Sequence, residues 1–330
     1  MTTINTGVIG CGFMGKIHAE NIIKIPHAKL TAVCKFRSPS AREFARKYDA
    51  ALFSSPDQLF KDANIHAVII SVPTPFHCEL TIQALTHGKH VFLEKPIAGT
   101  LKEAEEILRT HEESKNILMV GHVLRFFQEY VHIKNLMDSG RAGKIGTART
   151  ARRARFPQGS HTWYANRRMS GGVLLDMMIH DFDFLRWCFG EVKEVYARSI
   201  SPDVVQQTDF AVAMLQFNSG VIAHCEGSWA YEGEFHSTFE AAGDMGLITY
   251  NSLETSPIQA AYKHDQVRAK VALPKSPLKH SPYLLELKHF FECIPEGKVP
   301  SIKVSEAVEA IRISLSAIQS AKSGKPVILH

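Results

Sequence analysis

The chain has 330 residues, of which 45% are hydrophobic and 22% are charged, and its formal net charge is +5 at pH 7. This length exceeds what one ordinary hydrophobic core organises and predicts two domains, while the composition is typical of a soluble globular protein. The mild positive charge argues against nucleic-acid binding, which needs a strongly basic face, and favours a small anionic ligand.

The N-terminus and the cysteines indicate a cytoplasmic protein. "MTTINTGVIG" lacks the basic region and long apolar stretch of a signal peptide, and no segment approaches the length of a bilayer span. Six cysteines are scattered without a CxxC pair, mostly within apolar runs, so we expect reduced core residues. We therefore predict no membrane association.

Apolar strands and helical patterns alternate from the N-terminus to residue 122. The strands are expected just before the first glycines and at 28–36, 65–73, 90–94 and 117–122. Helical patterns follow the first glycines and recur at 38–48, 76–88 and 101–115. This alternation, with short connections, predicts an α/β fold with a parallel, doubly wound sheet, a Rossmann domain over residues 1–122.

The first strand leads into "GCGFMG", which supplies Gly10, Gly12 and Gly15 as G-x-G-x-x-G. The first glycine allows a tight turn, the second lets a pyrophosphate approach the backbone, and the third lets helix and strand pack closely. The N-terminus of the following helix offers free N–H groups to phosphates. We predict a dinucleotide site here, with Phe13 and Met14 beside the glycines.

The end of the second strand bears on the choice of cofactor. Enzymes that use NAD usually place Asp or Glu there, on the ribose 2′-hydroxyl. This chain has Lys35 and Arg37 instead, which could bind a 2′-phosphate with Ser38 or Ser40 as further donors. We therefore predict NADP as the preferred cofactor, with NAD as the other candidate. Solvated loop charges are the alternative interpretation.

The run "HVFLEKPIAG" ends a buried strand with Glu94, Lys95 and Pro96. The two charges could simply mark where the strand reaches the surface. Alternatively, the strand carries Lys95 to the carboxyl edge of the sheet, where ligands of doubly wound folds bind, and Pro96 ends the ladder.

Apolar residues at helical spacing predict one helix over 170–190, with Asp176 and His180 one turn apart on the same face. Such a pair can handle a proton, because a carboxylate holds and tunes the imidazole. A structural hydrogen bond is equally open. A metal site would need further ligands, and no second H-x-x-x-H or cysteine cluster appears, so we predict no metal.

Beyond residue 122 the pattern changes to short alternating runs, which predict an antiparallel sheet. The runs lie at 194–200, 210–217, 221–229, 235–243 and 246–251. Such a sheet needs its outer face covered, and another subunit is the economical cover, so we expect a homodimer or homotetramer. This second domain is assigned to 123–300, and the last helix, in 301–330, is expected to pack back on the first domain.

Two polar segments of the second domain are candidates for ligand contact. The strand at 147–156 places Arg149, Arg153 and Arg155 on one side and Arg152 opposite, which favours a solvated or subunit-facing strand over an anion site. An aromatic pair among polar groups suits a sugar ring, although a loop tryptophan can equally be a packing anchor. The candidate substrate contacts are Arg125, His161, Trp163, Tyr164, Asn166 and Arg167.

The motifs "GVIGCGFMG", "SVPTPFH", "EKP" and "GGVLLDMMIHDFDFL" resemble, in order and spacing, the glucose–fructose oxidoreductase and inositol dehydrogenase family, Gfo/Idh/MocA. The resemblance extends over nearly the whole chain. It implies a Rossmann domain followed by an α+β domain with a large open, mostly antiparallel sheet that commonly makes dimer or tetramer contacts.

The resemblance also implies roles for individual residues. Lys95, Asp176 and His180 would form the catalytic set. The residues along the nicotinamide side of the cofactor would be Pro73, Thr74, His77, Glu94 and Lys95. Ser71 is a further expected cofactor contact.

The implied activity is NAD(P)-dependent oxidation of a secondary hydroxyl of a cyclic polyol or pyranose sugar, with His180 as base and Lys95 polarising the oxygen. One alternative is a glycosidase of the family's NAD-dependent kind, in which oxidation starts an elimination. The other is a dinucleotide-binding sensor without turnover.

Overall fold

The computed structural model describes residues 3–36, 40–157, 163, 166–202, 205, 208–254, 257–262 and 281–329. The chain divides into two compact units. The first comprises Met1–Val123 with His280–Ile311, and the second comprises Leu124–Lys279 with Arg312–His330.

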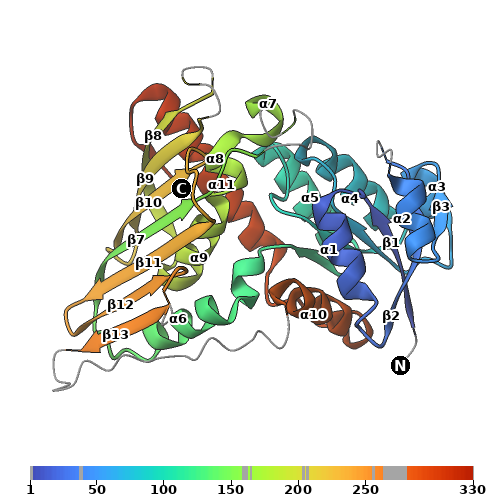
Figure 1. Cartoon of the computed structure of the whole chain (residues 1–330), viewed down its shortest axis with the longest axis horizontal. Coiled ribbons are helices and arrows are strands. Elements are labelled where there is room, and N and C mark those ends of the chain that lie inside the picture. The colour runs from blue at the N-terminus through green and yellow to red at the C-terminus, as the bar shows by residue number, and fades with distance from the viewer. Residues whose placement is uncertain are drawn as a thin grey trace. The chain divides into compact units, whose positions relative to one another are not determined.

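The first unit is built on a parallel sheet with the strand order β3-β2-β1-β4-β5-β6, of which Figure 1 labels β1, β2 and β3. Its strands are β1 (Ile4–Ile9), β2 (Ala28–Cys34), β3 (Ala51–Phe53), β4 (Ala67–Ile70), β5 (His90–Leu93) and β6 (Leu118–Val120). The strand order reverses between β1 and β4, and ligands of open α/β sheets bind outside the carboxyl ends of the strands at such a point. The predicted doubly wound fold is confirmed.

Helices connect these strands. They are α1 (Phe13–Ile22), α2 (Ala41–Lys47), α3 (Pro56–Lys61), the 3-10 turn η1 (Thr74–Phe76), α4 (His77–Thr86) and α5 (Leu101–Glu113). Local sequence explains several starts. Ser55 accepts a hydrogen bond from the N–H of Gln58 at the start of α3, and Thr100 forms a capping box with Glu103 at the start of α5.

Helix α10 (Pro282–Glu296) also belongs to the first unit, whereas we expected residues up to 300 in the second domain. Its Phe290 packs edge-on against Phe92 of β5, with the ring centroids 5.8 Å apart. The apolar stripe of a helix reveals that one face is buried, but not which sheet covers it.

Helix α11 (Val304–Ser323) differs from the expectation in a similar way. We expected the whole segment 301–330 to pack on the first domain, but from Arg312 onward the chain belongs to the second unit. Ile313 and Ala317 lie in the core of that unit.

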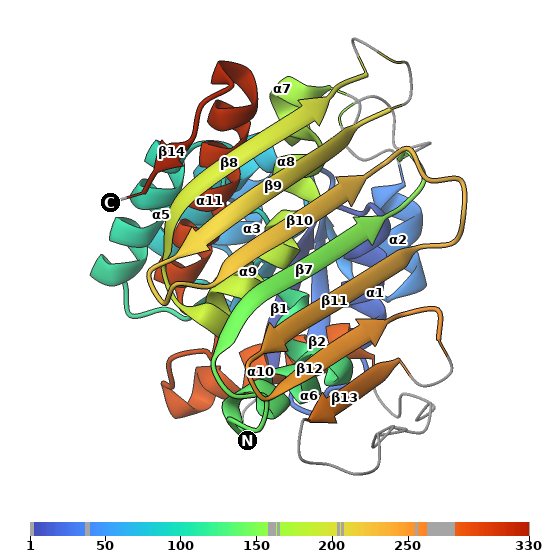
Figure 2. The ribbon, with the colours of Figure 1, turned by 90° about the vertical axis from the view of Figure 1, so that its left-hand side faces the viewer.

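The second unit is built on a sheet with the strand order β13-β12-β11-β7-β10-β9-β8-β14, shown face-on in Figure 2. Its strands are β7 (Ile145–Arg153), β8 (Val192–Ile200), β9 (Phe210–Phe217), β10 (Ile222–Ser228), β11 (His236–Gly243), β12 (Gly246–Asn251), β13 (Ile258–Tyr262) and β14 (Val327–Ile328). Strands β7 and β10 pair in parallel, and the other described pairs are antiparallel. The predicted mostly antiparallel sheet is confirmed.

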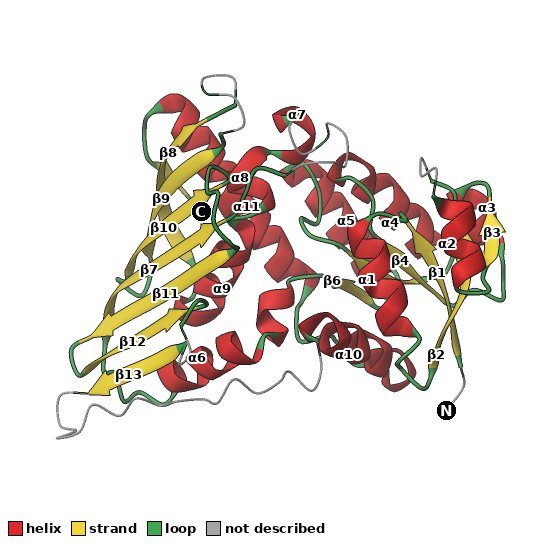
Figure 3. Ribbon diagram, viewed as in Figure 1, coloured by secondary structure: helices red, strands yellow, loops and turns green. Residues whose placement is uncertain are grey.

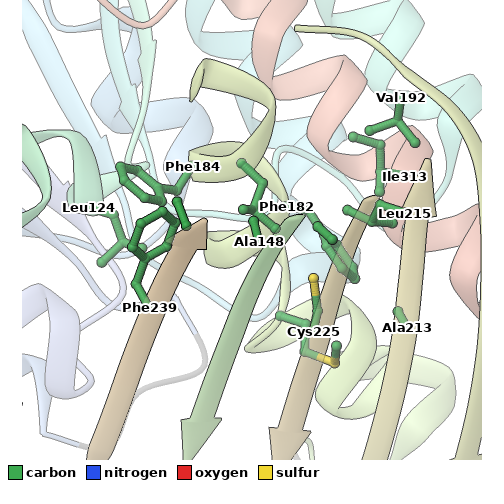
Figure 4. Close-up of a cluster of buried hydrophobic side chains, with 14 of the residues drawn as sticks. Leu124, Ala148, Phe182, Phe184, Val192, Ala213, Leu215, Cys225, Phe239 and Ile313 are labelled. Atoms are coloured by element: carbon green, nitrogen blue, oxygen red, sulfur yellow. The ribbon is translucent and has the colours of Figure 1, made fainter. Parts of the chain in front are cut away.

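Helices pack on one face of this sheet (Figure 3). With α11 they are η2 (Val123–Phe126), α6 (Gln128–Asp138), α8 (Gly172–Asp176) and α9 (Ile179–Phe189), and the short helix α7 (Arg167–Ser170) leads into α8. Figure 4 shows part of the core between them, where Phe182 and Phe184 of α9 meet residues of the strands such as Leu215 and Phe239. Within the described ranges, no helix is both long enough and apolar enough to cross a membrane.

Strand β7 carries a buried and an exposed arginine as the period of two predicts. Arg152 is buried, and its Nε and Nη2 donate to the two oxygens of Asp181 over 2.9 and 3.1 Å. Nη2 also donates to the hydroxyl of Tyr130 over 3.1 Å. Arg149 points to the other face and pairs with Glu240 in an exposed ion pair.

Replacing these two arginines should have very different effects. Arg152→Met is expected to lower the free energy of unfolding by roughly 3–5 kcal/mol, because it leaves a buried carboxylate without its partner. Arg149→Met, the matched control on the same strand, should cost at most about 1 kcal/mol. Urea unfolding followed by circular dichroism measures both, and equal losses would contradict the assignment.

Candidate active site

The glycine-rich turn after β1 is packed tightly against the end of β4. Gly10 has a φ of +101°, and a Cβ on it would overlap the carbonyl oxygen of Ser71. A Cβ on Gly15 would likewise overlap the carbonyl oxygen of Gly10. The Ser71 hydroxyl donates to that same Gly10 carbonyl over 2.9 Å. Two of the three predicted glycines are therefore required by close backbone packing.

Gly12 differs from these two glycines, because it faces open space that a ligand could occupy. No described atom lies within 4 Å of a Cβ built on it. It is also the N-cap of α1, a helix with no side-chain cap and no acidic residue in its first turn. The first N–H groups of α1 and its dipole are thus available to an anion, and the turn fits the pyrophosphate of a dinucleotide. Phe13, 79% exposed, and the half-buried Met14 follow directly.

The end of β2 presents Lys35 as an exposed side chain. Its backbone N–H donates to the Phe53 carbonyl over 2.9 Å, which extends the pairing with β3. The next residue, Phe36, packs edge-on against Phe76 of η1, with the ring centroids 5.2 Å apart. Lys35 therefore occupies the position from which a dinucleotide ribose is recognised. Arg37 lies outside the described residues.

Strand β5 carries Lys95 to the same edge of the sheet. The N–H of Glu94 donates to the Ile70 carbonyl over 2.9 Å, so pairing with β4 continues to the residue before Lys95. Lys95 is half-buried. Because β1, β4 and β5 are neighbours in a parallel sheet, the glycine turn, Ser71 and Lys95 all follow carboxyl ends at one edge.

The first residue of α4, His77, links two of these turns. Its buried ring lies with Nδ1 2.7 Å from the Pro96 carbonyl oxygen and Nε2 2.9 Å from that of Val72. Burial lowers the pKa of His77, although both contacts with carbonyls oppose the shift. The ring thereby holds the turn after Lys95 to the turn after β4. Of its predicted companions, Pro73 is half-buried and Thr74 is buried.

The second predicted cluster lies in the second unit, and there the structure corrects the expectation of one helix over 170–190. Helix α8 ends at Asp176 and α9 begins at Ile179, so the buried Asp176 and the half-buried His180 lie on two different helices. Among the described residues, no three His, Cys, Asp or Glu side chains are grouped as metal ligands would be.

The break between α8 and α9 has a packing cause that periodicity does not reveal. The N–H of Met178 donates to the Val173 carbonyl over 2.9 Å, a wider turn than that of an α-helix. The Met178 side chain packs against Gly227 of β10, where any Cβ would overlap it. Every residue from 173 to 179 is buried, so no exposed position marks where α8 ends and α9 begins.

Arg125, a predicted substrate contact, has a structural partner. Its Nε and Nη2 donate to the two oxygens of Asp183 over 3.0 and 2.7 Å, and both side chains are buried. Its guanidinium also lies 5.4 Å from the ring centroid of Trp187. With the Arg152–Asp181 pair, this contact holds α9 at two points.

The loop before α8 holds the remaining predicted contacts. Trp163 is half-buried, and the Asn166 side chain accepts the N–H of Arg168 as the N-cap of α7. The Nε of Arg167 lies 3.8 Å from the Asp209 carboxylate, which also accepts the N–H of Val173 at the start of α8. The predicted contacts His161 and Tyr164 lie outside the described residues.

Two buried titratable residues near Lys95 were not predicted. His18 of α1 contacts the Glu94 carboxylate, with 2.6 Å between Nε2 and Oε1. Glu286 of α10 is buried, and burial together with the charge of Glu94 raises its pKa well above the usual range. A polar residue inside the apolar stripe of each helix is the signal that could have identified them.

Two family models match the chain. A model described as an oxidoreductase family with an NAD-binding Rossmann fold matches residues 4–122. A model described as the GFO/IDH/MocA C-terminal domain matches residues 130–249.

Similar proteins cover nearly the whole chain. The myo-inositol 2-dehydrogenase of Thermotoga maritima is 30% identical over 98% of this chain and 98% of that protein. The scyllo-inositol 2-dehydrogenase (NAD(+)) of Bacillus subtilis is 29% identical over 99% of this chain and 96% of that protein. Among solved structures, the myo-inositol 2-dehydrogenase of Lactobacillus plantarum covers 100% of both chains with a TM-score of 0.86 and 26% identity.

The open space at Gly12 can be tested directly. Gly12→Ala should fold like the wild type but bind a dinucleotide at least about tenfold more weakly, because the methyl group occupies the space through which the pyrophosphate reaches the backbone. Isothermal titration with NADH and NADPH measures the affinity. Gly146→Ala on β7, which also faces open space, is the matched control. An unchanged dissociation constant for Gly12→Ala would contradict the site.

Proposed function

Because this chain belongs to the Gfo/Idh/MocA family of oxidoreductases and carries an NAD-binding Rossmann domain, we propose that it oxidises a secondary hydroxyl of a cyclic polyol or pyranose sugar. A bound nicotinamide dinucleotide supplies the hydride acceptor. The relatives named as inositol 2-dehydrogenases support this substrate class. The observation in this structure that carries the proposal is the position of Lys95, at the sheet edge that also holds the glycine turn.

The chain would supply a base and a polarising group. His180 accepts the hydroxyl proton, because a neutral imidazole is a suitable base near neutral pH. Lys95 donates a hydrogen bond to the same oxygen and stabilises its developing negative charge. Asp176 orients the imidazole or holds a neighbouring substrate hydroxyl. For this chemistry, Lys95 and His180 must both reach one oxygen atom.

Substrate contacts are assigned to the loop before α8. Trp163, Tyr164 and Arg167 combine an apolar face with hydrogen-bond donors, which suits a ring bearing hydroxyl groups. Arg125 enters this proposal as the residue that holds α9, and thereby His180, through Asp183.

We further propose NADP as the preferred cofactor. The support is the exposed Lys35 at the end of β2, where an enzyme specific for NAD would carry a carboxylate. An ammonium at that position attracts a 2′-phosphate, whereas a carboxylate would repel it.

A second copy of this chain is proposed to cover the outer face of the eight-stranded sheet. No described helix of this unit lies over that face (Figure 2). Met214 and Ile222, 49% and 45% exposed, lie there on the neighbouring strands β9 and β10. Two arginines of this face pair with glutamates of the same face, Arg149 with Glu240 and Arg153 with Glu226. Such pairing reduces the repulsion between two identical faces.

A substrate panel tests the proposed reaction and the cofactor preference together. Inositols, aldoses and their derivatives are offered with NAD and with NADP, and formation of the reduced nicotinamide is followed by its absorbance. We expect reduction with at least one of these alcohols and a lower KM for NADP. Lys35→Asp should shift the preference toward NAD, whereas Lys29→Asp, an exposed control on the same strand, should not.

Two outcomes of the panel would contradict these proposals. A lower KM for NAD in the wild type would overturn the preference for NADP. Release of an aglycone without net reduction of the cofactor would show that the activity is that of a glycosidase and not that of a dehydrogenase.

The proposed roles predict large losses of turnover. His180→Ala should reduce kcat by a factor of about 10²–10⁴, the usual contribution of a positioned base, and Lys95→Ala should reduce it at least as much. Lys102→Ala, an exposed lysine on α5, is the control. Wild-type turnover in either variant would refute the role given to that residue.

The proposed subunit contact predicts a change in mass. Light scattering coupled to gel filtration should give the wild type the mass of a dimer or tetramer, and Met214→Glu should shift it toward the monomer because a charge would be buried. Leu253→Glu, at an exposed position outside these strands, should leave the mass unchanged. A monomeric wild type would overturn the proposal.

A further inference from the structure

A fully buried imidazole lies next to the residue that precedes Lys95. His18 has 0% exposure, and its ring packs edge-on against Phe92, with 5.1 Å between the centroids. Its Nε2 is 2.6 Å from Oε1 of Glu94. Its Nδ1 has no hydrogen-bond partner among the described residues. The contact with Glu94 therefore offsets the cost of burying a polar imidazole at this position in α1, where an apolar residue would otherwise be expected.

The Glu94 carboxylate connects that imidazole to the backbone of Lys95. Its second oxygen, Oε2, accepts the N–H of Lys95 over 3.3 Å. The Glu94 side chain is 11% exposed, so the connection is shielded from water. A short chain of contacts thus runs from α1 through Glu94 to the peptide that sets the direction of Lys95.

The charges around Glu94 keep it ionised. Burial is the largest single influence and pushes the pKa of Glu94 upward, but the hydrogen bond with His18 and the electrostatic effects of His18, Lys95 and His77 together outweigh burial, so the pKa lies below its ordinary value. A further titratable neighbour is Glu286 of α10, whose raised pKa favours its neutral form. Glu94 is therefore the charged member of this buried pair of acids.

We propose that His18 is a positioning residue for Lys95, acting through Glu94. Since His18 has no accessible surface, it touches neither substrate nor cofactor and acts only through the carboxylate it holds. Fixing both oxygens of Glu94 fixes the turn from which the Lys95 side chain projects, and small displacements of a catalytic group are costly. The inference rests on the catalytic role proposed above for Lys95.

Two substitutions of His18 separate positioning from packing. His18→Leu removes the hydrogen bond and should reduce kcat about 10- to 100-fold, the order expected for a displaced catalytic group. His18→Gln places an amide N–H near the position of Nε2 and should restore most of this loss. Thermal unfolding of both variants checks that they are folded. Unchanged kcat in folded His18→Leu, or equal losses in both variants, would overturn the proposal.

The pH profile gives a second readout, which a merely structural role would not move. Without His18, burial dominates at Glu94, so its carboxyl group takes up a proton at a higher pH. The acid limb of kcat/KM should therefore move to higher pH in His18→Leu, while His77, Lys95 and Glu286 remain in place. A limb that does not move would contradict the link through Glu94.

The two buried acids provide a matched pair of variants. Glu94→Gln removes a charge and should lower kcat, whereas Glu286→Gln replaces a neutral acid with a neutral amide and should leave kcat within about twofold. Titration with NADH and NADPH should give Glu286→Gln the dissociation constants of the wild type. A loss of dinucleotide affinity in Glu94→Gln, with no loss of kcat, would assign Glu94 to cofactor contact and would overturn the proposal.

A chemical readout keeps this inference distinct from the proposed function. The rate at which an amine-reactive reagent labels Lys95, measured by mass spectrometry, does not depend on turnover. Loss of the carboxylate that accepts the Lys95 N–H releases the turn and changes the direction of the Lys95 amine, so the labelling rate should change in Glu94→Gln and stay unchanged in Glu286→Gln. If no alcohol is oxidised but these rates differ as expected, only the proposed function fails. If alcohols are oxidised and the rates are equal, only the positioning role fails.

Discussion

The first unit depends on the close approach of three strand ends that are far apart in the sequence. The turn after β1 is bound to the end of β4 through the Ser71 hydroxyl and the Gly10 carbonyl. The end of β4 is bound to the turn after β5 through the ring of His77. These contacts are made by buried backbone carbonyls, which need a partner wherever they occur. A dinucleotide turn and a lysine are thereby held on one rigid edge rather than on independent loops.

In the second unit, buried ion pairs hold helix α9 in place. Two arginines, from β7 and η2, each make bidentate contacts with an aspartate of α9. Removing such charges from water is costly, and only the paired geometry offsets that cost. Because the pairs lie on either side of Phe182, helix α9 can neither slide nor rotate without leaving a buried charge unpaired. The broken helix that carries His180 is thus fixed by electrostatics as well as by packing.

The sequence pattern predicted those elements whose structure depends mainly on neighbouring residues in the chain. Continuous apolar runs predicted the parallel strands except the short edge strand β3, alternation predicted β8 to β12, and the glycine spacing predicted the turn at Gly10. Features set by distant partners were not predicted, because one sequence does not say which side chains meet. The break at Met178 depends on a glycine in β10, and the role of Arg125 depends on Asp183. The placement of α10 depends on which sheet buries its apolar stripe.

The two proposed catalytic residues share a local arrangement. Lys95 and His180 are both half-buried, and each is adjacent in sequence to a buried acid. Glu94 is held by a histidine of α1, and Asp181 by an arginine of β7. A flexible or titratable side chain cannot itself be fixed by packing if it must meet a ligand. The residue next to it in the sequence can be fixed, because its side chain contacts a partner from another element. Consecutive residues share a peptide plane, so fixing that neighbour also fixes the plane from which the functional side chain projects. In both units, therefore, the residue beside the reactive group restricts its direction while leaving its functional atoms accessible.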